Sequence, residues 1–157
     1  IAANETVAVG IRPQITSLDL SHVANLDDRQ PSWGVTTSGR GGRSFTRGIA
    51  SAVTVIADNA SIADAAATSI ANACFVEDDS IVQIPAEQMD LNTDLKGVNV
   101  TVDVGLLSPG KKIQAVQTAL SKADTLCRQK LIVGALVALE DIFVMTESVE
   151  EFISPSN

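Results

Sequence analysis

The chain has 157 residues, of which 45% are hydrophobic and 19% are charged, so it can bury a core of its own. Its formal net charge of −8 argues against a general nucleic-acid binder, because such proteins present a basic face to phosphate. No apolar run is long enough to span a bilayer and no signal-peptide pattern appears, so we expect a cytoplasmic protein without a membrane partner.

The first sixty residues contain three clear predicted strands and one ambiguous segment. Residues 6–10 form an alternating run rich in β-branched side chains before Gly10 and Pro13 end the strand. Residues 14–26 fit neither a strand nor a helix period, and we favour a strand followed by irregular chain. Residues 27–32 have the composition of a loop. Residues 33–39 and 53–56 predict the second and third strands.

A helix is predicted to follow, from Ser61 to about Cys74. Ser61 and Asp64 have the spacing of a capping box ahead of an apolar run, so we expect Ser61 to cap this helix. Cys74 and Cys127 lack the spacing of a redox or zinc motif, and both are expected to act as small buried hydrophobic residues.

The second half predicts two strands, a helix and a hairpin. Strands are expected in residues 81–85 and 98–104, with one helical turn between them. Ser108 and Pro109 are typical of a helix start, and apolar residues then recur at helical spacing up to Cys127. Two strands are predicted around Glu140 and Asp141, and the acidic residues 147–157 are expected to fray.

The resulting order, β-β-β-α-β-β-α-β-β, predicts an α+β fold. We expect one domain with a mixed or antiparallel sheet and helices packed on one face. His22 is the only histidine, and we interpret it as structural because no serine or cysteine nucleophile can be assigned to it.

Asp64 and Thr68 are the candidate metal ligands. They stand four residues apart, on one face of the predicted helix. A carboxylate and a hydroxyl are hard oxygen donors that suit Mg²⁺, with water and substrate phosphate completing the shell. The alternative is that Asp64 stabilises the first turn and Thr68 bonds back to a carbonyl of its own helix.

The segment of residues 38–44 is the candidate anion-binding loop. It contains Gly39, Gly41 and Gly42, which let a ligand approach the backbone. Arg40 and Arg43 could clamp a phosphate or a carboxylate. The loop is not a Walker A motif, because no Gly-Lys-Ser/Thr follows, and it is not a dinucleotide fingerprint, because a strand follows it. The alternative is a flexible hairpin with solvated arginines.

Two segments together resemble the ApbE-like superfamily, best known for FAD:protein FMN transferases. They are GVTTSG, residues 34–39, and SAVTVIADNASIADAAATSIANA, residues 51–73. The family pattern of a Ser-Gly turn, a Thr-Val-Ile-Ala strand and an Asp-Ala-x-x-Thr helix is met at Ser38, Gly39, Thr54, Asp64 and Thr68. The resemblance implies that Asp64 and Thr68 bind Mg²⁺, and that the metal holds a flavin nucleotide such as FAD or FMN. The resemblance and the composition of the loop together give five candidate cofactor-binding residues: Ser38, Gly39, Arg40, Arg43 and Thr54.

One departure points to a particular branch of that superfamily. The transferases carry a His-Ile-Ile-Asp-Pro-x-x-Gly stretch where residues 40–52 here read RGGRSFTRGIASA. The chain therefore looks like the shorter branch of unknown function, some of whose members are associated with sulfur incorporation into homocysteine. The match covers about residues 33–139, and the longer family members imply that about the first third of the protein is missing here.

Two functions follow from the resemblance. The first is an enzyme that uses Mg²⁺ to bind a phosphate-bearing ligand, such as a flavin nucleotide, in a transferase-like reaction. The second is a non-catalytic scaffold or partner protein with a degenerate site. A purely structural domain is the third interpretation. Surfaces rich in alanine and valine favour a homodimer.

Overall fold

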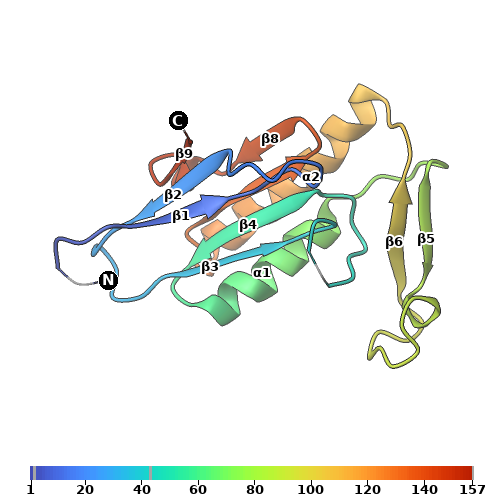
Figure 1. Cartoon of the computed structure of the whole chain (residues 1–157), viewed down its shortest axis with the longest axis horizontal. Coiled ribbons are helices and arrows are strands. Elements are labelled where there is room, and N and C mark those ends of the chain that lie inside the picture. The colour runs from blue at the N-terminus through green and yellow to red at the C-terminus, as the bar shows by residue number, and fades with distance from the viewer. Residues whose placement is uncertain (2, 43, 157) are drawn as a thin grey trace.

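The computed structural model describes residues 1, 3–42 and 44–156 and confirms the α+β fold, with strands in three antiparallel sheets. The first sheet has the order β1-β2-β9, the second β3-β4-β7-β8, and the third is the β5–β6 hairpin (Figure 1). The strands are β1 Val7–Ile11, β2 His22–Leu26, β3 Gly34–Ser38, β4 Ala52–Ala57, β5 Ile81–Pro85, β6 Asn99–Val104, β7 Gly134–Leu139, β8 Ile142–Met145 and β9 Ile153–Pro155. The helices are α1 Ala60–Ala73 and α2 Pro109–Arg128, and there are two short 3₁₀ turns, Ala86–Gln88 and Glu147–Val149.

The four-stranded sheet is the middle layer of the molecule. Both of its central strands, β4 and β7, are buried along their whole length. Alternate side chains of β4 face opposite layers: Val53 and Val55 join the core beneath α1 and α2, whereas Ile56 joins the core shared with β1, β2 and β9. This burial on both faces explains why the sequence of β4 is almost entirely apolar.

The three-stranded sheet covers the face of β4 and β7 that the helices leave free. The prediction that residues 147–157 fray is wrong for the residues that the structure describes. Phe152 and Ile153 are 6% and 4% exposed, and β9 pairs with β2. Burial of these two apolar side chains outweighs the acidic composition of the segment. The segment 14–26 also differs from its prediction, because irregular chain comes first and β2 follows.

Helix α1 begins one residue earlier than the sequence predicts. Its N-cap is Asn59, whose side chain accepts a hydrogen bond from the Ile62 amide at 3.0 Å. The predicted cap, Ser61, lies inside the helix, so the capping box is wrong. For α2 the prediction is confirmed, since Ser108 caps the helix and Pro109 opens it.

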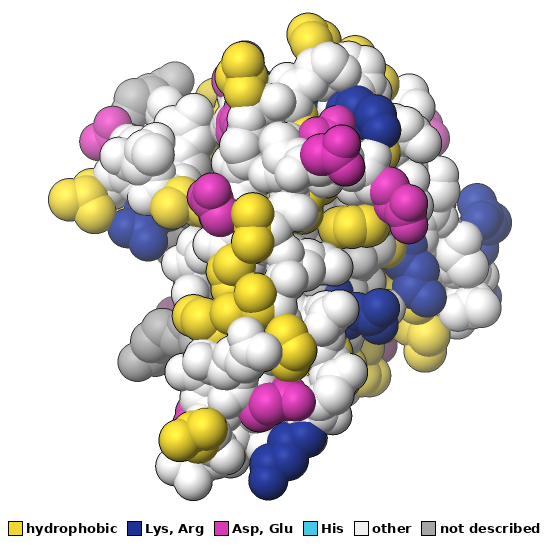
Figure 2. Space-filling view, turned by 90° about the vertical axis from the view of Figure 1, so that its right-hand side faces the viewer, with side chains coloured by type: hydrophobic (Ala, Val, Ile, Leu, Met, Phe, Trp, Pro, Cys, Tyr) yellow, Lys and Arg dark blue, Asp and Glu magenta, His cyan; other side chains and the backbone are white. Residues whose placement is uncertain are grey.

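The β5–β6 hairpin stands at one end of the molecule, beside the other layers (Figure 1). It is tied to the chain before β4 by the Thr101 amide, which donates to the Thr46 carbonyl at 2.8 Å. Figure 2 shows hydrophobic side chains gathered on the face of the molecule at this end. Leu91 and Leu106 are 82% and 94% exposed.

The cysteines and the histidine occupy structural positions. Cys74 is buried at the end of α1, and desolvation raises the pKa of its thiol to about 12. Cys127 is half-buried on α2 and is not in a disulfide. His22 packs beside Phe143, and partial burial lowers the pKa of its imidazole. In the described residues, no helix has both the length and the apolar character needed to cross a membrane.

Candidate functional site

Four of the seven predicted site residues line one small cavity. Ser38 and Gly39, at the end of β3, meet Asp64 and Thr68 of α1 around a space of about 100 Å³. Three further residues complete the lining: Thr37, Gly42 and Ser44. Gly39 and Asp64 are twenty-five residues apart in the sequence. The structure thus brings the two sequence motifs together around one cavity. We call this space the Asp64 cavity.

The Asp64 and Thr68 side chains are exposed and available to a ligand. The helix begins at Ala60 with no acidic residue in its first turn, so Asp64 does not cap it. On α2, Thr118 and Thr125 donate hydrogen bonds to the carbonyls four residues earlier. Among the described residues, Thr68 makes no such bond. The alternative, in which Asp64 stabilises the first turn and Thr68 bonds back to its own helix, is therefore not seen in the described residues.

The wall opposite α1 is held in place by Gly39. Its φ of +125° is a conformation that side chains rarely adopt. A Cβ atom there would lie 3.0 Å from the carbonyl oxygens of Ala50 and Ser51. These same two carbonyls accept hydrogen bonds from the amides of Arg40 and Gly41, at 2.9 and 3.0 Å. The start of the loop is therefore pinned to the chain just before β4.

Arg40 and Thr54 lie apart from the Asp64 cavity. Arg40 is half-buried and lines two other spaces, one of which shares Gly42 and Ser44 with the Asp64 cavity. Thr54 is 1% exposed and shares the face of β4 that carries Ile56, opposite α1. Its hydroxyl is 2.8 Å from that of Thr37. The remaining predicted residue, Arg43, lies outside the described residues.

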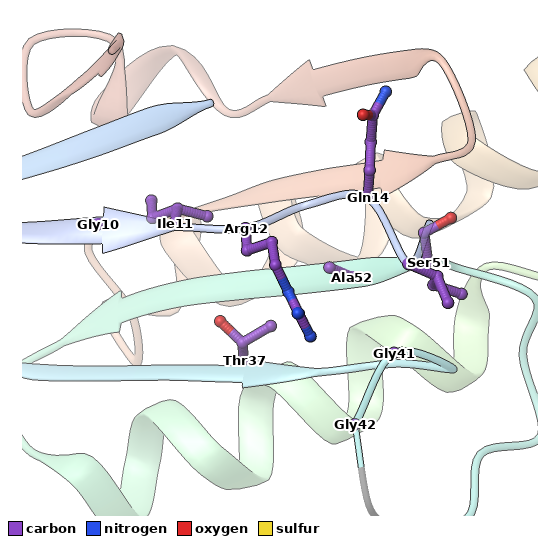
Figure 3. Close-up of a pocket in the computed structure, with 10 residues that line it drawn as sticks. Gly10, Ile11, Arg12, Gln14, Thr37, Gly41, Gly42, Ser51 and Ala52 are labelled. Atoms are coloured by element: carbon purple, nitrogen blue, oxygen red, sulfur yellow. The ribbon is translucent and has the colours of Figure 1, made fainter. Parts of the chain in front are cut away.

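A second space of about 260 Å³ lies across β3 from the Asp64 cavity, and both contain Thr37 and Gly42 in their walls. Figure 3 shows Arg12 extending from the end of β1 across β4 toward β3, where Thr37 is close to its tip. The sequence did not single out Arg12 or Thr37, because neither belongs to a recognised motif: Arg12 lies in the turn after the first predicted strand, and Thr37 lies within the second.

A third space, also of about 260 Å³, adjoins the Asp64 cavity on the side of β6. It shares Gly42 and Ser44 with that cavity. Phe45 and Met89 are part of its lining, and the two side chains come from segments more than forty residues apart. We call it the Phe45 cavity. An aromatic ring and a thioether give it a surface on which a planar ring system can pack.

A family model with the description "AbpE bacteria" matches residues 1–149. The chain belongs to this family. No curated protein and no solved structure gave a significant match to it.

The donors that this AbpE family member presents in the Asp64 cavity are all oxygens. Asp64 supplies a carboxylate, and Ser38, Ser44 and Thr68 supply hydroxyls. Across the described part of the chain, no three histidine, cysteine, aspartate or glutamate side chains cluster as a metal site. One carboxylate with hydroxyls fits Mg²⁺, which typically keeps several waters and binds through one or two carboxylates together with substrate phosphates.

Proposed function

We propose that this member of the AbpE family is an ApbE-like protein that binds Mg²⁺ together with a phosphate-bearing ligand in the Asp64 cavity. The observation that supports this most is the convergence of Ser38, Gly39, Asp64 and Thr68 on one cavity. The family description "AbpE bacteria" is close to the superfamily name but does not by itself state a reaction.

The donor set explains why metal and ligand would bind together. Asp64 provides a single carboxylate, too little charge to compensate Mg²⁺ for the waters it would lose. A ligand phosphate adds the missing anionic oxygens and so completes the coordination shell. Asp64 and Thr68 would hold the ion, and the ion would neutralise the phosphate in a chain with a net charge of −8. We therefore expect weak binding of Mg²⁺ alone and tighter binding with the ligand.

The size of the cavity limits what it can hold. A space of about 100 Å³ takes an ion and a few oxygens, since each water occupies about 30 Å³ in the liquid. A flavin or nucleotide ring must lie outside it. The Phe45 cavity is next to it and offers Phe45 and Met89 for stacking, which favours a ligand with a planar ring, such as FAD, FMN or another nucleotide.

The test is the thermal stability of the protein with FAD, FMN and ATP, each with and without Mg²⁺. A ligand at a hundred times its dissociation constant raises the free energy of unfolding by about 2.7 kcal/mol. We expect such a rise only when Mg²⁺ is present, and we expect Asp64→Asn to abolish it. The matched control is Asp124→Asn, the same change on α2. No rise with any ligand, or an equal rise in Asp64→Asn, would rule the proposal out.

A second candidate, a non-catalytic partner protein in anaerobic sulfur metabolism, has its own supporting observation. Leu91 and Leu106 expose most of their apolar surface at the β5–β6 end of the molecule. Large apolar side chains exposed at one end of a molecule are typical of interaction surfaces. Sedimentation velocity of the wild-type chain and of Leu91→Ser/Leu106→Ser tests the homodimer form of this function. We expect the wild-type chain to be a dimer and the double variant to be a monomer. A monomeric wild type would exclude the homodimer form.

A further inference from the structure

We propose that a larger cavity, on the other side of the loop from Asp64, binds a small anion with an apolar body, with Arg40 as the residue that recognises its charge. This cavity has a volume of about 660 Å³, within the range of small-molecule sites. We call it the Arg40 cavity. It is distinct from the Asp64 cavity, with which it shares no lining residue.

Arg40 is a half-buried cation that lacks an anionic partner among the described residues. The ion pairs of these residues involve Arg29, Lys111 and Lys112, not Arg40. A guanidinium removed from bulk water is stabilised by an anion that accepts two parallel hydrogen bonds. Two acidic residues, Glu140 and Asp141, line the same cavity, but neither forms an ion pair with Arg40, so its guanidinium is available to an anion from outside.

Hydrogen bonds fix the main chain at Arg40 in advance of binding. The Arg40 amide donates to the Ala50 carbonyl at 2.9 Å, and the next amide, of Gly41, donates to the Ser51 carbonyl at 3.0 Å. Ala50 and Ser51 are 1% and 5% exposed, so this wall is part of the packed core. The main chain therefore need not be ordered when a ligand binds, and the entropy cost falls on the Arg40 side chain alone.

The rest of the lining suits an apolar body with a few polar groups. Ile15, Ile49 and Leu139 give the cavity an aliphatic wall, and Gln14 and Thr16 add groups that can form hydrogen bonds. Of the other charges in the wall, Lys112 is paired with Glu140, whereas the exposed Asp141 forms no ion pair with a described residue. Among these lining residues, Arg40 is therefore the positive charge left to bind an anion.

Two unfavourable placements meet at this cavity. Glu140 has a φ of +53° in the two-residue turn between β7 and β8, where glycine is strongly preferred. Lys112 lies at the N-terminal end of α2, where the helix dipole disfavours a positive charge. The ion pair between these residues, and the 2.9 Å hydrogen bond from the Glu140 amide to the Ser51 hydroxyl, hold the turn against the cavity. Strain kept at one place by such contacts is typical of ligand sites.

The experiment is a titration of the full chain in EDTA with hexanoate, hexyl phosphate, norleucine and the neutral hexanamide, followed by NMR chemical shifts. We expect the anions to bind with a dissociation constant below about 10 mM. Hexanamide should bind at least about tenfold more weakly. Shifts should centre on the amides of Ser51 and Glu140. Hexanoate against hexyl phosphate identifies the preferred head group, and norleucine tests whether Asp141 favours an added ammonium.

Arg40→Gln should weaken anion binding about tenfold or more, because a charge-assisted hydrogen bond is lost. Arg47→Gln is the matched control, an exposed arginine of the same segment that does not line this cavity, and should bind as the wild type does. If Arg40→Gln does not fold, Arg40→Lys should still bind more weakly than wild type, since lysine lacks the fork.

The proposal would be overturned by no anion binding up to about 10 mM, by equal binding of hexanamide, or by unchanged binding in Arg40→Gln. Because no metal is present in this titration, its outcome is separate from that of the proposed function. Asp64→Asn should bind the anions normally. If Asp64→Asn lost anion binding while Arg40→Gln kept it, the anion would lie in the Asp64 cavity instead. That result would also overturn the proposal.

Discussion

The Asp64 cavity and the Arg40 cavity lie on two sides of one loop and are built from opposite kinds of group. The first is small and lined by oxygen donors around one carboxylate. The second is more than six times larger, partly aliphatic, and is lined by the half-buried Arg40. The first suits a cation and the second an anion. Neighbouring residues of one glycine-rich segment can therefore serve two different chemistries when the backbone directs their side chains to opposite sides.

Changing the loop that divides the two cavities should have the largest effect. In Gly39→Ala the new Cβ would meet carbonyl oxygens at 3.0 Å, in a conformation that alanine disfavours. We expect a loss of about 2–3 kcal/mol in the free energy of unfolding, measured with urea, and weaker binding at both cavities.

Gly97→Ala is the control for this substitution. Gly97 also has a positive φ, +76°, but its Cβ would meet nothing within 4 Å. It should lose about 1 kcal/mol and leave both cavities unchanged. Equal losses in the two variants would show that Gly39 has no special role in shaping the loop.

The strain at Glu140 can be measured by comparing two substitutions. Glu140→Ala and Glu140→Gly both remove the ion pair to Lys112, but only glycine relieves the positive φ. We expect Glu140→Gly to be more stable than Glu140→Ala by about 1 kcal/mol in urea unfolding. Equal stabilities would mean that the turn is not strained, and would remove one support for the Arg40 cavity.

Thr54 offers a sharper distinction between fold and site. Its hydroxyl pairs with that of Thr37 on the face of β4 opposite α1. Thr54→Val should lower the free energy of unfolding by about 1 kcal/mol, because a buried hydrogen bond is lost. The Mg²⁺-dependent thermal shift should stay the same. A loss of that shift in a stably folded Thr54→Val protein would return Thr54 to the metal site.

The smallest effect concerns pH. The hydrogen bond from Lys112 to Glu140 raises the pKa of the Lys112 ammonium above its ordinary value of 10.5. Stabilisation from this pair is therefore fully present below pH 10.5 and is lost as the pH rises through the raised pKa. The stability difference between wild type and Lys112→Met should be constant from neutral pH up to that value. A difference that disappears near neutral pH would contradict the ion pair.

Local patterns predicted the secondary structure well, and the reason is physical. Residues 52–57 and 109–128 carry strong strand and helix signals, and both elements form as expected. The errors occur where two local signals compete or where distant contacts decide. Asn59 and Ser61 are both good capping residues, and Asn59 acts as the cap. The segment after Glu147 is acidic, yet Phe152 and Ile153 anchor it in a core that the local sequence does not show.

The site was partly predictable for a similar reason. Asp64 and Thr68 could be paired because helical spacing fixes their common face, and the resemblance linked them to Ser38 and Gly39. Sequence order could not separate Arg40 from Ser38, which is two residues away, because the separation depends on hydrogen bonds to Ala50 and Ser51. The Arg40 cavity draws on segments from Gln14 to Asp141, so only the folded chain reveals it.

The most direct test of the metal site is to replace Mg²⁺ with paramagnetic Mn²⁺ and to map which amide signals broaden when FAD, FMN or ATP is present. The account predicts that broadening centres on Ser38, Gly39, Asp64 and Thr68, and that Asp64→Asn removes it. Broadening centred on the acidic turn at Glu77, Asp78 and Asp79, or broadening that is the same in Asp64→Asn, would contradict a metal site at the Asp64 cavity.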